Sequence, residues 1–198
     1  MKKGITMKKI LFLFSVVLFL TAGVEAKVYT PEDLIPCEDA FCDKDGNLLS
    51  GEFQATYSSG KIKYKGQYNF GLPEGVFTLY REDGSLHQEE TYKQGKKNGL
   101  KKTYNNEGKI TAEALFNNGV IDEYAKFYYP DGKIFAQMSY KEGKLDGTSQ
   151  FFDEAGLLRA ELNVEDGKAV SGYEYDELGR KSRMKYKDIQ AFMKKYPQ

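Results

Sequence analysis

The chain has 198 residues, of which 40 % are hydrophobic, 29 % charged and 14 % aromatic, and its formal net charge is zero. This mixed composition excludes a wholly disordered chain, and the balanced charge gives no sign of nucleic-acid binding. Fifteen tyrosines, thirteen phenylalanines and twenty glycines favour β-structure with many tight turns over a helical bundle.

Residues 1–26 have the pattern of a signal peptide. Four lysines precede the apolar run 10–20, and small residues follow up to Ala26. We therefore expect cleavage after Ala26 and export to the periplasm, the cell surface or the medium. The alternative is an uncleaved membrane anchor, although eleven apolar residues are short for a span of about 20 residues. Cleavage leaves 25 basic and 28 acidic side chains, a formal charge of −3.

Residues 27–50 form an N-terminal segment that contains both cysteines of the chain, Cys37 and Cys42. In an oxidising compartment a pair at this separation can close a local disulfide, and the alternative is two free thiols. A metal site would require more Cys or His than the chain has.

Residues 51–184 contain an internal repeat with a period of 24 residues. Three interleaved series of glycines define the period, and one of them has glutamate at a single position. The series are Gly60, Gly84, Gly108, Gly132 and Gly156; Gly71, Gly95, Gly119, Gly143 and Gly167; and Gly51, Gly75, Gly99, Glu123 and Gly147.

Apolar and polar residues alternate between the glycines, as in half-buried strands. We expect each unit to be a β-hairpin, and we place Ile110, Ala112, Ala114 and Phe116 on one face of their strand. Two columns of equivalent residues are expected to be buried in the interior. They are Ile62, Leu86, Ile110, Ile134 and Leu158, and Tyr68, Tyr92, Phe116 and Tyr140.

Residues 185–198 show helical spacing of apolar residues, including Ile189, Phe192 and Tyr196, after the acidic Asp188. We expect a short amphipathic helix that covers the open end of the array, because terminal units of a repeat protein need a cap. The alternative is a frayed tail. The predicted fold is all-β: one elongated, antiparallel sheet of tandem hairpins with a short C-terminal capping helix.

The first unit resembles the MORN repeat, Y-x-G-x-[YW]-x-x-G-x-x-x-G, in the stretch that runs from Tyr64 to Gly84. Later units keep Y-x-x-G-x-x-[ND]-G but replace Gly66 with Glu90, Ala114, Met138 and Leu162. This departure resembles the bacterial MORN-variant repeat of YwqK-type antitoxins. The resemblance implies a protein-binding module whose partner is a toxin; fold resemblance alone is weak evidence for function.

The residues offer little for catalysis. His87 is the only histidine, and its place among lysines of neighbouring units indicates a solvated surface residue. No Ser-His-Asp, Cys-His or multi-His constellation can be built, and no phosphate-binding loop or dinucleotide motif is present. We therefore expect a protein that is not an enzyme and has no cofactor or metal.

Two sets of residues are predicted to bind a partner. The first is an aromatic column of the second strand, which interfaces favour; the alternative is that its rings pack over neighbouring hairpins. This column is Tyr80, Tyr104, Tyr128 and Phe152. The second is a lysine cluster able to attract anionic lipid or polymer, although lysine also protects exposed sheet edges. This cluster is Lys93, Lys96, Lys97, Lys101 and Lys102.

Two functions remain open at this stage. The first is an exported protein-binding module whose partner is a toxin of the envelope or the exterior. The second is a structural or adhesion component of the envelope that contacts membrane or an anionic polymer. Nucleic acid is not expected as a partner of either.

Overall fold

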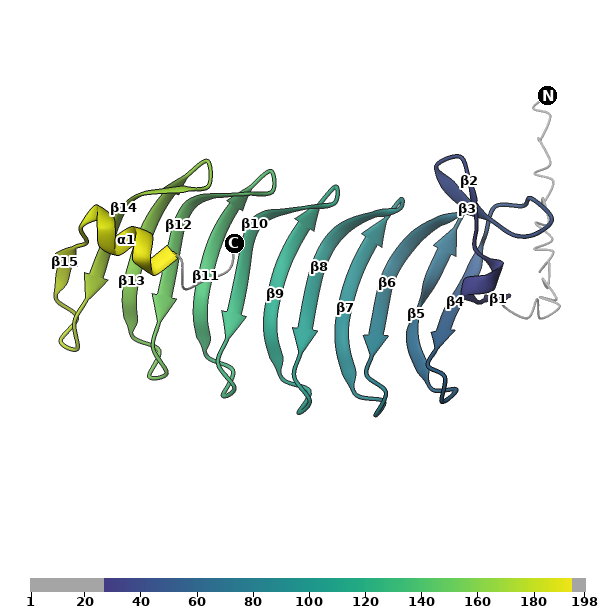
Figure 1. Cartoon of the computed structure of the whole chain (residues 1–198), viewed down its shortest axis with the longest axis horizontal. Helices are drawn as coiled ribbons and strands as arrows, with labels where there is room; N and C mark the ends of the chain where they lie inside the picture. Colours follow the sequence, from purple (N-terminus) through teal and green to yellow (C-terminus); the bar gives the residue numbers. More distant parts are fainter. Residues whose placement is uncertain (1–26, 194–198) are drawn as a thin grey trace, which may run out of the picture.

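The structure is a computed structural model that describes residues 27–193, so the predicted signal peptide and the last five residues lie outside the described part. Its main body is one long sheet of 13 strands in chain order (Figure 1). The predicted all-β, elongated sheet of tandem hairpins with a short C-terminal helix is therefore confirmed.

The N-terminal segment comprises β1 (Val28–Tyr29), a 3-10 turn (Pro31–Asp33), β2 (Ile35–Cys37) and β3 (Ala40–Cys42). The repeats comprise β4 (Gly51–Thr56), β5 (Ile62–Asn69), β6 (Leu72–Tyr80), β7 (Leu86–Lys93), β8 (Lys96–Tyr104), β9 (Ile110–Asn117), β10 (Val120–Tyr128), β11 (Ile134–Lys141), β12 (Lys144–Phe152), β13 (Leu158–Glu165), β14 (Lys168–Tyr175) and β15 (Lys181–Arg183). The helix α1 (Tyr186–Met193) follows. Consecutive strands from β4 to β15 are antiparallel, and β1 pairs in parallel with β4.

Two kinds of connection alternate along the sheet. The first kind is a two-residue turn in which both residues have positive φ, as in Phe70 (φ 48°) and Gly71 (φ 77°) between β5 and β6. This is the geometry of a type I′ turn, whose twist matches that of the flanking strands and which favours glycine at its second position. Each turn is also tied to the preceding unit, since the amide of Gly95 donates to the carbonyl of Pro73 at 3.0 Å, and later units repeat this bond.

The second kind of connection is a longer loop, and next to it the pairing of the two strands shifts by one residue. In β10 and β11, Phe127 pairs with Ala136 while the next residue, Tyr128, pairs with Ile134. Adjacent strand residues point to opposite faces, so Ile134 and Ala136 also lie on opposite faces despite being two residues apart. The same shift recurs in every hairpin from β4–β5 to β12–β13.

This shift corrects two expectations. Ile110 does not share a face with Ala112, because Ile110 pairs with Tyr104 and its side chain lies on the same face of the sheet as that of Tyr104. The column of Ile62, Leu86, Ile110, Ile134 and Leu158 is not the buried interior: Ile62 is 37 % exposed and the others are half-buried. Simple alternation misplaced them because it takes no account of the extra residue in each bulge. In the tyrosine column only Tyr68 is fully buried, while Tyr92, Phe116 and Tyr140 are half-buried.

We call the face that bears Phe53, Phe77, Ala125, Met138 and Leu162 the inner face, because the N-terminal segment and α1 pack against it. Side-chain sizes on it are complementary along neighbouring strands. A Cβ at Gly66 would collide with the ring of Phe77, and a Cβ at Gly172 would stand 2.5 Å from Leu162. Two later units have Ala114 and Met138 in place of this glycine, and there a smaller residue, Ala125 or Ser149, takes the place of Phe77.

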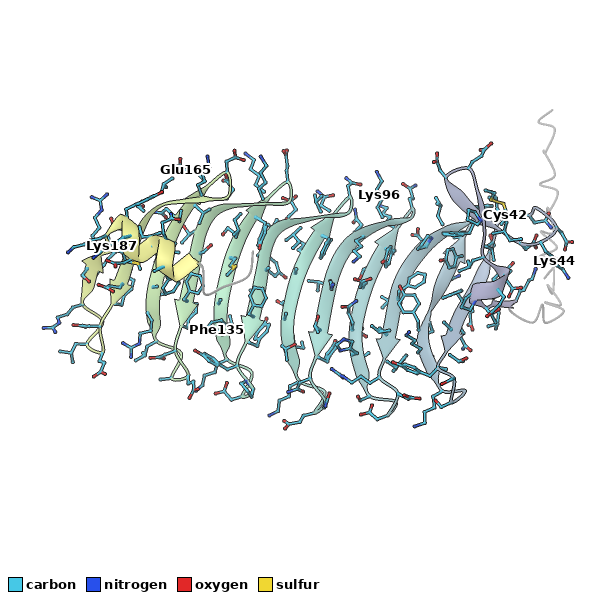
Figure 2. The ribbon with its side chains drawn as sticks, viewed as in Figure 1. Cys42, Lys44, Lys96, Phe135, Glu165 and Lys187 are labelled. Atoms are coloured by element: carbon cyan, nitrogen blue, oxygen red, sulfur yellow. A yellow bond between two sulfur atoms is a disulfide. The ribbon has the colours of Figure 1, made fainter. Side chains whose placement is uncertain are left out.

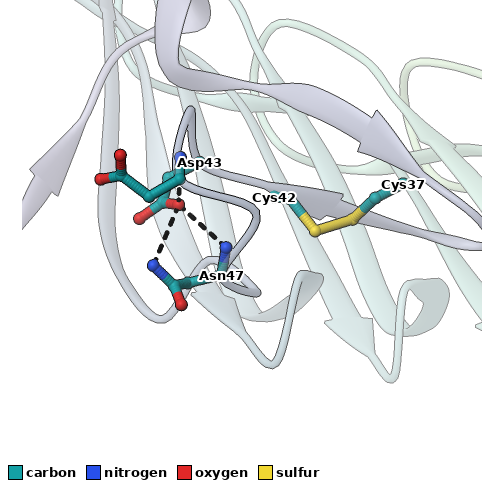
Figure 3. The surroundings of a disulfide bond; sticks show 5 residues. Cys37, Cys42, Asp43 and Asn47 are labelled. Atoms are coloured by element: carbon teal, nitrogen blue, oxygen red, sulfur yellow. Dashed lines mark hydrogen bonds between the residues drawn. A yellow bond between two sulfur atoms is a disulfide. The ribbon is translucent and has the colours of Figure 1, made fainter.

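The N-terminal segment covers the first strands of the inner face. Leu49 is fully buried among Tyr29, Phe53, Tyr68 and Phe77, and the ring of Phe41 packs edge-on against Tyr68. The segment contains a disulfide between Cys37 and Cys42 (Figure 3). The following loop is held by the Asp43 carboxylate, which accepts bonds from the amides of Asp45 and Asn47.

The helix α1 covers the last strands of the inner face (Figure 1). Ile189 is 3 % exposed and packs in the cluster that contains Leu162 and Val164, while the ring of Phe192 meets Phe151 edge-on with centroids 4.7 Å apart. The helix thus lies across the face of the terminal units instead of closing the open edge, where β15 is the last strand.

Candidate functional site

Between the two covered ends, the inner face of β8, β9 and β10 carries an open depression of about 350 Å³. Its floor is formed by small side chains, including Thr103, Ala112 and Ala114, and its walls by Phe116, Phe127 and Tyr140. The depression is mostly apolar, and Lys101 supplies a charge at its border. An open, apolar floor with an aromatic wall and one polar margin is a surface suited to another molecule.

A charged cluster adjoins the depression on the β7–β8 hairpin. The carboxylate of Glu90, which is 7 % exposed, accepts bonds from Lys97 Nζ at 2.6 Å and from Tyr92 Oη at 2.8 Å. Lys101 Nζ lies 3.4 Å from the same carboxylate. Two ammonium groups therefore share one carboxylate, and the cluster carries a surplus positive charge beside the depression.

The pKa values of this cluster follow from its contacts. Burial raises the pKa of Glu90, but the hydrogen bonds from Lys97 and Tyr92 and the charges of the two lysines outweigh it, so that the pKa is lowered overall. Burial, together with the bond to Glu90 and its charge, raises the pKa of Tyr92. Glu90 thus stays ionised and Tyr92 stays neutral over the physiological range.

The five lysines predicted as one basic patch do not form one. Lys97 and Lys101 belong to the inner cluster, whereas the neighbouring Lys102 lies on the opposite face, where it pairs in register with Glu89 and Glu113. Lys93 and Lys96 face each other at the end of their hairpin, where both are exposed (Figure 2 labels Lys96). The patch was expected because the sequence places the five lysines within ten residues, but alternation and the turn separate them.

The aromatic column Tyr80, Tyr104, Tyr128 and Phe152 lies on the opposite, outer face and is half-buried. Tyr104 Oη donates to Glu89 Oε2 at 2.6 Å. Burial, with the hydrogen bonds and charges of Glu89 and Glu113, raises the pKa of Tyr104 and Tyr128 to about 12. The hydroxyls of Tyr104 and Tyr128 thus contact glutamates of their own sheet.

Sequence reasoning missed the central inner face. Its distinguishing residues, such as Ala112 and Ala114, are small and carry no motif. One signal was available: Lys97 and Lys101 occupy repeat positions that are Leu145 and Ser149 two units later, so a charge appears where the repeat elsewhere has an apolar or small residue.

Within residues 27–193, no three His, Cys, Asp or Glu side chains are grouped so that they could hold a metal ion. Over the same residues, no helix has the length and apolar character needed to cross a membrane. His87 is half-buried, and its Nδ1 lies 2.9 Å from a guanidinium nitrogen of Arg81.

Comparison with known proteins gives one family match. The family model of the MORN repeat variant matches residues 73–94, 97–118 and 124–142, which cover strands of the central hairpins. No curated protein matches the chain. Among solved structures, the GtfA/B complex bound to UDP and GlcNAc is similar over 70 % of this chain and 24 % of that chain, with 12 % identity and a TM-score of 0.24. Such a score supports no argument about fold or function. The matched segments, together with the 24-residue period and the hairpins, support MORN-variant repeats over residues 73–142.

Proposed function

We propose that the protein is an exported, non-catalytic module that binds another protein through the central part of its inner face. The observation that carries the proposal is the depression on β8, β9 and β10, which is left open between two ends that the chain itself covers. A monomer gains nothing by leaving apolar floor and aromatic walls open in this way, so a partner is the physical reason for them.

Export and the identity of the partner are further parts of this proposal. The signal-like residues 1–26 and the disulfide Cys37–Cys42 support an oxidising, extracytoplasmic location. The resemblance to YwqK-type repeats supports a toxin as the partner. An exported antitoxin would meet its toxin in the envelope or outside the cell, as an immunity protein does.

The experiment is affinity capture from envelope and medium fractions of the native cell with two variants of adjacent residues in β8. Thr103→Arg places a long, charged side chain over the floor of the depression, while Lys102→Arg places the same side chain on the outer face. We expect wild type and Lys102→Arg to retain the same partner and Thr103→Arg to lose it. Equal capture by all three, at equal thermal stability, would refute binding at this site.

A second function is favoured by the exposed pair Lys93 and Lys96 at the hairpin end, which suits contact with an anionic membrane or polymer. It predicts an envelope component that sediments with membranes and binds anionic liposomes. Lys93→Ala with Lys96→Ala would abolish liposome binding under this alternative and leave partner capture unchanged under the first proposal.

A further inference from the structure

The depression and the surface beneath α1 lie at equivalent positions of the repeat, two units apart. Moving two units along the chain takes Thr103 to Phe151, Ala112 to Ala160 and Ala114 to Leu162. The helix rests on the later set, where Ala160 is 2 % exposed and Leu162 is fully buried. The earlier set has no described element above it, and Ala112 and Ala114 remain half-exposed.

The dimensions of the two places agree. An α-helix with its side chains is about 10–12 Å wide, and strands lie about 4.8 Å apart, so a helix covers roughly three strands. The residues beneath α1 belong to β12, β13 and β14, and the floor of the depression belongs to β8, β9 and β10. The apolar residues of α1 that face the sheet, Ile189 and Phe192, are three positions apart and therefore on one helix face.

The charges differ between the two places. Met138, Leu145 and Ser149 beneath the covered end correspond to Glu90, Lys97 and Lys101 beside the depression. This exchange adds one carboxylate and two ammonium groups, of which one positive charge is left over. A bound molecule would therefore be stabilised by a carboxylate at the edge of its apolar face, which would pair with the surplus positive charge.

From these observations, and resting on the proposed function, we propose that the partner presents an amphipathic helix that lies across β8, β9 and β10. Its apolar side chains, spaced three or four residues apart, enter the depression, and an Asp or Glu at its margin pairs with Lys101. The chain's own residues 194–198 do not fit this description, because they include Lys194 and Lys195 and no acidic residue.

The test is selection of peptides from a displayed library of helix-forming 14-residue sequences, about four turns long, against the full exported protein. We expect enriched peptides with apolar residues three and four apart and an excess of Asp and Glu. They should bind Thr103→Arg undetectably and Lys101→Ala about tenfold more weakly, with a reduced salt dependence. Lys102→Ala, which removes the same charge from the outer face of the same strand, should bind like wild type.

Three results would overturn this proposal. They are enrichment of basic or non-helical sequences, equal weakening by Lys101→Ala and Lys102→Ala, or no enriched sequence that Thr103→Arg loses. Sedimentation velocity tests a second copy as the occupant: a concentration-dependent dimer that Thr103→Arg abolishes would also overturn the partner helix. If Thr103→Arg loses the native partner but the library yields no acidic helix, the helix fails while the proposed function stands.

Discussion

On the inner face, the buried carboxylate of Glu90 lies 2.6 Å from the ammonium of Lys97, whose side chain is 32 % exposed, and these two positions are Met138 and Leu145 two units later. The repeat thus accommodates either a charged or an apolar group at one place in the fold. Removing only one partner of a buried pair leaves an uncompensated charge, whereas an apolar replacement of the whole group is often neutral or stabilising.

The first prediction uses this exchange. Glu90→Met alone should destabilise the protein by about 1–3 kcal/mol, because Lys97 and Lys101 lose their carboxylate. Adding Lys97→Leu and Lys101→Ser, which completes the apolar set of the later unit, should recover most of the loss. Urea unfolding of the single and triple variants measures both. A triple variant less stable than the single one would contradict the equivalence of the two units.

The second prediction concerns pH. The folded-state pKa of Glu90 is lowered, so its stabilising contribution is present above its unfolded pKa and is lost as the pH falls through the folded value. Wild type should therefore lose more stability between neutral and acidic pH than Glu90→Gln. Unfolding midpoints across this range give the comparison, and parallel curves for the two proteins would show that the carboxylate contributes nothing.

The third prediction concerns Glu123, which has φ 69° where equivalent residues are Gly75, Gly99 and Gly147. A side chain at a left-handed position is strained, so Glu123→Gly should stabilise the protein by about 0.5–1 kcal/mol. Gly147→Ala should destabilise it, because its Cβ would also stand 3.1 Å from Cβ of Ser139. Thermal unfolding of both variants is the measurement, and changes of the same sign would be inconsistent with this reading.

The fourth prediction separates docking of the N-terminal segment from turn strain. Gly71 and Gly119 occupy the same turn position, with φ 77° and 94°, but a Cβ at Gly71 would stand 2.6 Å from the carbonyl oxygen of Phe41 while the space at Gly119 is open. Gly71→Ala should therefore cost more stability than Gly119→Ala and speed amide exchange in residues 40–49. Equal costs would mean that the segment does not depend on this contact.

The fifth prediction concerns the outer aromatic column. Tyr104→Ser with Tyr128→Ser should lower stability by about 2–4 kcal/mol, because half-buried rings and their bonds to Glu89 and Glu113 are lost. Tyr104→Phe with Tyr128→Phe, which keeps the rings, should lose less. Partner capture by folded protein at low temperature should be unchanged in both pairs. Lost capture with unchanged stability would instead restore this column as the binding surface.

The periodic glycines were sufficient to predict the hairpins and the single sheet, since positive φ at fixed intervals leaves few other backbone geometries. The faces of the strands could not be predicted as well. The bulge after each long loop places Ile110 on the outer face beside Tyr104, and no residue type at the bulge announces it. Alternation is reliable only between bulges.

The site was less predictable than the fold, because it is the part of the inner face that neither the N-terminal segment nor α1 covers. Ala112 and Ala160 are the same residue in the same column, yet Ala112 is half-exposed, whereas Ala160 is buried in the cluster that includes Ile189 of α1. Likewise, the sequence does not distinguish Lys101 from Lys102. In the strand, Lys101 lies beside Glu90 on the inner face and Lys102 lies on the outer face.

The comparison that tests the central claim most directly is partner capture by wild type, Thr103→Arg and Lys102→Arg, with thermal stability measured on the same preparations. The account predicts that Thr103→Arg loses the partner while it remains folded, and that Lys102→Arg keeps it. Retention of the partner by a folded Thr103→Arg, or its loss from Lys102→Arg alone, would contradict recognition at the centre of the inner face.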